Sequence, residues 1–322
     1  MKIASGVVGL IISLTFLPFA VATAQEGASS IEEVIVTARK RDESLQEVPI
    51  AITAFTEQTI ERAGIERPAD FISLMPNVTI VDTANVGDTQ VSIRGIVSTR
   101  DAESTFAYVV DGVLSTNPNS FNEELVGVQQ IEVLKGPQGA LYGRNAVAGA
   151  ILVTTKEPGQ EFQGNVQLGV GDPAQQKAAF HFGGGLADNL RASFSGSYRK
   201  NDGHYRNLID GKSGTVDYLQ DISGRVRAIW EPNEDVRIDA RLGHSEVEGG
   251  AINFNASFAI PVFAGVFGAP NFDQNVNDLD FRYAFNVPGE NEQTTTDFAL
   301  KADWSVNDIG LTAIISVRIG EP

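Results

Sequence analysis

Residues 131–156 read IEVLKGPQGALYGRNAVAGAILVTTK, in which two strand-like apolar runs flank a glycine-rich centre. Such a turn can bind phosphate, but a P-loop needs Lys and then Ser or Thr directly after its last glycine. Arg144 and Asn145 follow Gly143 instead, and the glycine spacing does not fit a dinucleotide fingerprint. The pattern favours a tight turn over residues 136–139, with proline in its second position, and then close packing of backbone.

The first 24 residues have the pattern of a secretory signal peptide. Lys2 precedes an apolar run over residues 7–21, and the segment ends in Ala-Thr-Ala, an A-x-A cleavage site. The apolar run is short for a membrane span, which leaves an uncleaved anchor helix as the alternative. We therefore expect export and a mature chain that begins near Gln25.

Composition excludes several classes of function. The net charge of −17 argues against a nucleic-acid binder, which needs a basic face. The chain has no cysteine, and its three histidines lie far apart and outside any zinc motif, so we expect no metal site in the protein. A secreted enzyme on a β-scaffold is an alternative class, but no nucleophile, base and orienting group can be assembled from the motifs. We therefore expect no enzyme activity.

Residues 31–38 form a short β-prone run rich in branched side chains. Small polar residues precede it and a charged stretch follows it, so residues 25–47 are expected to form a mobile N-terminal arm. A mobile segment of this kind can add itself as a strand to the sheet edge of a partner. The alternative is that the run is the first strand of the next domain.

Residues 48–160 have the pattern of a compact mixed domain. A helix is expected to begin over residues 56–60, with Thr56 and Thr59 as the two candidate caps, and a second helical turn over residues 69–75 is ended by Pro76. Strands are expected over residues 50–55, 78–81, 90–94, 106–110 and 131–134.

After residue 164 apolar and polar side chains alternate with a period of two in about seven segments. A strand with one apolar and one charged face suits a wall between lipid and water, although a soluble half-buried sheet has the same alternation. In the membrane reading the lumen-facing positions include four arginines, which form a cationic wall. These are Arg199, Arg225, Arg227 and Arg241.

The lengths of the connections support the membrane reading, because outer-membrane barrels have short periplasmic turns and long external loops. Three connections on one side are short, at residues 186–189, 231–235 and 306–310. The other side has long connections at residues 200–219 and 245–293 and one short turn at 172–176.

Several motifs in a fixed order resemble the plug domain of TonB-dependent outer-membrane receptors. They are Pro76-Asn77-Val78, Ser92-Ile93-Arg94-Gly95, Val109-Val110-Asp111-Gly112-Val113 and the run over residues 131–156. The resemblance implies that the glycine-rich run is the structural end of the plug, with Gly143 and Gly149 where backbone packs closely. The residues of this motif are Gly136, Pro137, Gly139, Tyr142, Gly143, Arg144 and Gly149. The run that follows the signal peptide resembles the TonB box of the family. Its residues are Ile31, Glu32, Glu33, Val34, Ile35, Val36, Thr37 and Ala38.

The resemblance implies a mixed α/β plug over residues 48–160, followed over residues 161–322 by part of an antiparallel transmembrane β-barrel. A plugged barrel has roughly 22 strands, so about seven strands are an incomplete barrel, and the chain is not expected to transport alone. A non-transporting TonB-binding fragment is therefore one alternative.

The implied function is active uptake of a scarce ligand, most often a ferric siderophore, across the outer membrane of a Gram-negative bacterium. The implied partners are TonB with its inner-membrane energising complex, a small-molecule ligand and outer-membrane lipid. No cofactor is expected, because iron arrives inside the transported chelate.

Because the loop over residues 245–293 is rich in Asn, Phe and Gly, a receptor for an oligosaccharide or another neutral solute is the alternative. By their place in the motif order, the residues that face the ligand are Thr83, Asn85, Asp88, Arg94, Ser115, Asn117, Asn119 and Phe121. Arg94 is expected either to bridge plug and barrel or to approach the ligand.

Overall fold

The structure is a computed structural model, and residues 34–322 group into one unit by their contacts. It describes residues 34–82, 89–98, 103–115, 121, 123–172, 174–207, 211–212, 214, 216–250, 282–283, 290–307 and 309–321. The predicted signal peptide, the predicted start of the mature chain and Ile31, Glu32 and Glu33 lie outside the described residues.

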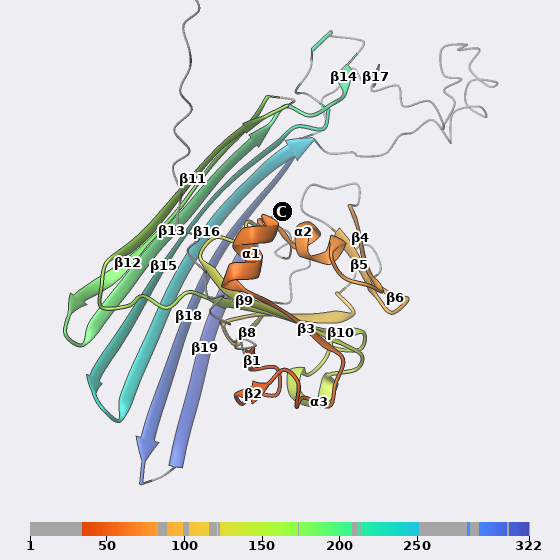
Figure 1. Cartoon of the computed structure of the whole chain (residues 1–322). Coiled ribbons are helices and arrows are strands. Elements are labelled where there is room, and N and C mark those ends of the chain that lie inside the picture. Colours follow the sequence, from red (N-terminus) through yellow and green to blue (C-terminus); the bar gives the residue numbers. More distant parts are fainter. Residues whose placement is uncertain are drawn as a thin grey trace, which may run out of the picture. The chain divides into compact units, whose positions relative to one another are not determined.

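A mixed five-stranded sheet forms the centre of the plug (Figure 1). β10 pairs in parallel with β7, and the other neighbours are antiparallel. In order across the sheet the strands are β3 (Ile52–Thr56), β9 (Val128–Lys135), β10 (Gly149–Thr155), β7 (Phe106–Val110) and β8 (Val113–Ser115). A separate antiparallel sheet contains β4 (Val78–Asp82), β5 (Thr89–Ile93) and β6 (Ile96–Val97).

Two helices of the plug lie where helical segments were predicted, and the second begins one residue before the predicted range and ends two residues before its end. α1 (Glu57–Ala63) is capped by Thr56, whose hydroxyl accepts a hydrogen bond from the Thr59 N–H at 3.4 Å. α2 (Pro68–Ser73) starts at a proline, which suits the first helical position because its missing N–H has no partner there. The short α3 (Gly139–Tyr142) follows the glycine turn and was not predicted from the sequence.

The two faces of the five-stranded sheet carry two different cores. Side chains alternate along a strand, so Ile131 and Val133 of β9 enter one core while Leu134 enters the other. The first core also holds the helices, with Phe71 fully buried. The second core is smaller, includes Ala38, and has Tyr142 packed against it.

Seven long strands form one antiparallel sheet in sequence order (Figure 1). Three consecutive strand pairs are separated by only two residues each, after Ala187, Asn233 and Val306, and this agrees with the three short connections that were predicted on one side of the sheet. The strands are β11 (Gln163–Gly171), β12 (Gln175–Ala187), β13 (Leu190–Asn201), β15 (Leu219–Asn233), β16 (Val236–Gly250), β18 (Glu290–Val306) and β19 (Ile309–Glu321). Two short segments in the long connections, β14 (Arg206–Asn207) and β17 (Arg282–Tyr283), pair in parallel.

The seven-stranded sheet has one apolar and one polar face, as the alternation predicted. Large apolar side chains on one face are exposed, among them Phe194, Trp230 and Leu242. The opposite face carries buried polar side chains such as Asp239 and Arg227. A sheet of this kind exposes an apolar surface to lipid and keeps its charged groups on the side of the plug.

Among the described residues, none of the helices is long and apolar enough to cross a bilayer.

The glycine motif contains two different structural requirements. A Cβ at Gly149 would overlap the carbonyl oxygen of Leu134 on the neighbouring strand, which confirms close backbone packing there. The same expectation is wrong for Gly143, because no atom lies within 4 Å of a Cβ built there. Gly143 instead has φ +75° and ψ −152°, a backbone conformation essentially confined to glycine.

Three alanine variants separate these requirements. We expect Gly149→Ala to lower plug stability by about 1–3 kcal/mol through overpacking. Gly143→Ala should cost a similar amount, about 1–3 kcal/mol, through backbone strain alone. Gly139→Ala is the matched control, because Gly139 is helical, has open space and needs no positive φ. Hydrogen exchange of the β9 and β10 amides measures these differences, and equal exchange in all three variants would contradict the assignment.

Candidate functional site

The described part of the predicted TonB box is a short strand in a hairpin. β1 (Ile35–Val36) pairs antiparallel with β2 (Glu43–Ser44), and the Leu45 N–H donates to the Val34 carbonyl at 2.8 Å. Val36 is 1% exposed and Ala38 is fully buried, whereas Ile35 is exposed. The side chains on one face of this segment are therefore packed on the plug, and the Ile35 side chain on the other face is exposed.

Side chains of β9 and α3 hold this strand on the plug. Glu132 Oε1 accepts hydrogen bonds from the Thr37 N–H at 2.9 Å and the Thr37 hydroxyl at 3.1 Å. Gln130 Nε2 donates to the Ile35 carbonyl at 2.9 Å, and the Tyr142 hydroxyl donates to the Ala38 carbonyl at 2.7 Å.

The expectation of a mobile arm over residues 25–47 is therefore corrected for residues 34–47. Ala38 belongs to the second core of the plug sheet and Val36 is also buried, which gives the arm a place to dock. Gln130 and Glu132 were not among the residues predicted from the sequence. The available signal was a carboxylate within the apolar run IEVL, at a position that faces the same core as Leu134.

Burial changes the acidity of two groups in this contact. It raises the pKa of Glu132 above its usual range, although the hydrogen bonds from Thr37 oppose the shift. Burial also raises the pKa of Tyr142 to about 12, and the nearby Glu132 carboxylate adds to this effect. Tyr142 thus keeps its proton at neutral pH and remains a donor to Ala38. Tyr142 was predicted only as a structural residue of the glycine motif, and its hydrogen bond to Ala38 was not indicated by that motif.

Three of the eight predicted ligand-facing residues lie within the described chain: Arg94, Ser115 and Phe121. Arg94 is exposed at the β5–β6 turn with φ +52°. Ser115 accepts a hydrogen bond from Arg318 of β19. The other five lie outside the described residues: Thr83, Asn85, Asp88, Asn117 and Asn119.

Phe121 does not face a ligand in this structure. It is 1% exposed, and its ring meets the rings of Phe106 and Tyr108 edge-on with centroids 5.0 Å apart in both pairs. Aromatic rings that pack in this way stabilise a core, so the assignment of Phe121 to the ligand site is corrected.

The remaining residues of the glycine motif stay structural, and Arg144 forms an exposed ion pair with Glu103 at 3.3 Å.

A buried network joins the sheet to the plug at Asp239. Its carboxylate binds Arg227 Nη2 at 2.7 Å and Arg241 Nη2 at 2.6 Å, all three on the seven-stranded sheet. Arg227 Nη1 donates to the Thr155 carbonyl at 3.1 Å, and Arg241 Nη1 donates to the Asp111 carbonyl at 2.9 Å. Two sheet arginines thereby fix the ends of two plug strands.

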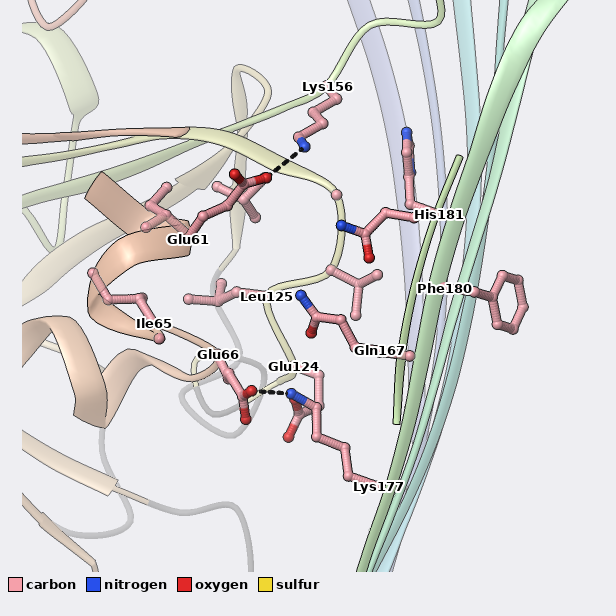
Figure 2. Close-up of a pocket in the computed structure, with 17 residues that line it drawn as sticks. Glu61, Ile65, Glu66, Glu124, Leu125, Lys156, Gln167, Lys177, Phe180 and His181 are labelled. Carbon is pink, nitrogen blue, oxygen red and sulfur yellow. Dashed lines mark ion pairs between the residues drawn. The ribbon is translucent and has the colours of Figure 1, made fainter. Parts of the chain in front are cut away.

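A second network lies at Glu66 and Glu124 of the plug (Figure 2). Arg199 of β13 binds Glu66 at 3.0 Å and Glu124 at 2.5 Å, and Lys177 of β12 also pairs with Glu66. Burial by itself raises the pKa of Glu66, but the hydrogen bond and charge of Lys177, with those of Arg199, hold it below its usual range.

These ion pairs border a polar pocket of about 190 Å³ between the plug and β11–β12. Figure 2 shows Gln167 and His181 on the sheet side and Leu125 on the plug side. A larger cavity of about 820 Å³ is lined by Thr37, Tyr142 and sheet side chains that include Arg237.

The four arginines face the plug, as the alternation predicted, but they do not form an unpaired cationic wall. Arg225 pairs with Glu123 at 3.7 Å, and the other three pair with the carboxylates described above. A buried charge must be paired, so these groups hold the plug on the sheet instead of presenting free charge to an anion.

Comparisons with known proteins give one consistent family. Residues 44–150 match the TonB-dependent Receptor Plug Domain. The chain is 29% identical over 261 residues to the iron-regulated outer membrane virulence protein of Vibrio cholerae, an alignment covering 75% of this chain and 38% of that protein. It is 31% identical over 177 residues to the vitamin B12 transporter of Vibrio vulnificus, covering 53% of this chain and 28% of the transporter.

A solved structure supports the fold. The ferric yersiniabactin uptake receptor FyuA from Yersinia pestis superposes with a TM-score of 0.72 at 20% identity, over 84% of this chain and 41% of the receptor. The pesticin receptor of Yersinia pestis is 28% identical over 173 residues, which cover 53% of this chain. The chain spans 26% of that receptor and less than two fifths of the other two relatives.

The Asp239 network gives a prediction about stability. Asp239→Asn leaves Arg227 and Arg241 buried without their shared carboxylate, and we expect a loss of about 3–5 kcal/mol. Asp303→Asn is the matched control on the same sheet, because its 3.1 Å pair with Lys301 is more exposed and contributes at most about 1 kcal/mol. Denaturant unfolding of the full-length protein measures both losses, and equal losses would contradict the role of the network.

Proposed function

This chain belongs to the TonB-dependent outer-membrane receptors, and we propose that the complete receptor actively takes up a ferric siderophore across the outer membrane. The observation that carries the proposal is the combination of a plug, a docked box strand and a sheet with an apolar outer face. These are the parts that an energised, plugged transporter needs. Binding and transport, without catalysis, are the proposed activity.

The proposed energy source is TonB with its inner-membrane complex. Strand addition uses backbone hydrogen bonds, and the box segment already has an extended conformation in β1. We propose that TonB pairs with this strand after ligand binding and pulls on the plug. The lipid of the outer membrane is the proposed partner of the apolar sheet face.

The proposed cargo rests on the names of similar proteins. One relative is described as iron-regulated, and the superposed structure is described as an uptake receptor for ferric yersiniabactin. In this proposal iron enters as part of the chelate, and the protein itself holds no cofactor.

A neutral solute is the second candidate cargo. The similar vitamin B12 transporter supports it, and the pairing of the sheet arginines removes the argument for an anionic ligand. The long connection that suggested an oligosaccharide lies mostly outside the described residues.

Uptake measurements decide between the two cargoes. We expect cells that carry the intact gene to accumulate iron from a ferric siderophore, and a protonophore to abolish this uptake. Deletion of the gene is the control. Growth on vitamin B12 or a glycan that depends on the gene, together with unchanged iron uptake after its deletion, would replace the siderophore proposal with the neutral-solute one.

Proline substitutions test the box. Val36→Pro and Val34→Pro each remove a backbone donor and fix φ, so we expect loss of TonB binding and of uptake while ligand binding persists. Val34→Ile and Val36→Ile are the controls, because they keep the donor and the β-branched side chain. Isothermal titration with the soluble periplasmic domain of TonB measures the first effect. Uptake that survives both prolines would show that the box lies elsewhere.

A further inference from the structure

The pocket between the plug and β11–β12 has a polar wall on the sheet side and an apolar wall on the plug side (Figure 2). Asn165 and Gln167 lie on the same face of β11, because they are two residues apart, and Asn165 is paired directly with His181 of β12. Ile65 and Leu125 of the plug lie across from them. A molecule in this pocket therefore meets hydrogen-bonding groups on one side and hydrocarbon on the other.

Small residues create the space. Ala179 lies opposite Gln167 and between Lys177 and His181 on the inward face of β12, so only a methyl group forms the floor. On the plug side Gly127 has φ +65°, and a Cβ built there would lie 2.6 Å from His181 Nδ1. A larger residue at position 127 would push the imidazole aside. The volume of about 190 Å³ equals that of about six water molecules, which is the size of one sugar ring.

The neutral polar groups of the pocket have unused hydrogen-bonding capacity. The Nδ1 atom of His181 is buried and has no hydrogen-bond partner within the described chain. In the same part of the chain, the carboxamides of Asn165 and Gln167 make no hydrogen bond. A carboxamide offers donors and an acceptor, and a neutral imidazole offers one of each. Because a buried polar group without a partner costs free energy, an occupant that supplies these partners is stabilised.

The charged groups of the pocket already have partners. Lys177 pairs with Glu66 at one end, and Lys156 pairs with Glu61 at 3.7 Å at the other (Figure 2). Glu124 is bound by an arginine of the sheet, as described above. A charged ligand would have to compete with one of these pairs, whereas a neutral ligand leaves them intact. Glu61 is exposed and its pair with Lys156 is longer than a hydrogen bond, so this end is the entrance.

We propose that this pocket binds a small neutral polyhydroxylated molecule of about one sugar ring. A hydroxyl group both donates and accepts, so it matches the carboxamides and the imidazole of the sheet wall, while the C–H face of the molecule packs on the apolar plug wall. Drug-sized ligands occupy pockets of about 300–1,000 Å³, so this one is too small for a whole siderophore and takes a different molecule from the proposed cargo. The occupant contacts plug and sheet together, and its binding therefore strengthens their attachment.

Binding of D-glucose to the full-length receptor tests the site. We expect saturation-transfer NMR to show saturable binding of D-glucose, and no binding of acetate or tetramethylammonium, which are the anionic and cationic probes. Ala179→Leu fills the floor of the pocket and should weaken glucose binding by about tenfold or more. Ala178→Leu is the matched control, because its side chain lies on the opposite face of the same strand, and binding should be unchanged.

A second variant removes hydrogen bonds without adding volume. Gln167→Leu keeps a side chain of similar size but has neither donor nor acceptor, and we expect it to weaken glucose binding by about tenfold. It tests the site even if Ala179→Leu does not fold.

Three results would overturn the site. Equal saturable binding by the unsubstituted receptor and Gln167→Leu would place glucose elsewhere. A signal that rises with concentration without saturating would mean an adventitious additive only. Stronger binding of acetate than of glucose would exclude a neutral ligand. Failure of the proposed function looks different, because cargo uptake by the unsubstituted receptor would be absent while saturable glucose binding persisted.

Discussion

The contact between the plug and the seven-stranded sheet depends on the carboxylate of Asp239, which holds Arg227 and Arg241 side by side. Two guanidinium groups repel each other, and in a buried site neither can be left to water. With Asp239 between them, each can direct its remaining N–H groups to the plug, at the Thr155 and Asp111 carbonyls. The sheet thereby binds backbone carbonyl groups of the plug. These two carbonyls are held in position for the arginines only when plug strands β7 and β10 are folded.

The five-stranded sheet serves two purposes because its two faces differ. One face carries the larger core with the helices, which makes the plug a folded unit. The other face carries a smaller core of mostly small side chains, and the box segment covers part of it through Ala38. A small core contributes less burial free energy, so this is the face from which a segment can detach without unfolding the rest.

Ion pairs between basic side chains of the sheet and carboxylates of the plug have a structural role that the net charge of the chain does not indicate. The chain is strongly acidic overall, yet basic side chains concentrate on the plug side of the sheet, where plug carboxylates neutralise them. One further pair has the opposite arrangement of charge, because Arg67 of the plug binds Asp221 of the sheet at 3.4 Å. These basic side chains therefore already have carboxylate partners, and any further contact with them must compete with those ion pairs.

The sequence by itself determined the local elements. Thr56 marks the start of α1, and Pro76 limits the helical segment that contains α2, because caps and prolines act within about one turn of backbone. The period-two alternation determined the seven long strands and their inward arginines, since side-chain direction in a strand depends only on position. The lengths of the connections indicated on which side of the sheet each one lies. The order of motifs was enough to indicate the family.

Only the tertiary structure decided which distant groups meet. Thr37 and Glu132 are separated by 95 positions, and no local pattern in either segment specifies the other. The same holds for the partners of the inward arginines and for Phe121, whose motif suggested a ligand site but whose ring is buried by Phe106 and Tyr108. Local propensity and period set the conformation of each segment, whereas pairing of buried charges and filling of a core depend on all the segments that reach the same place.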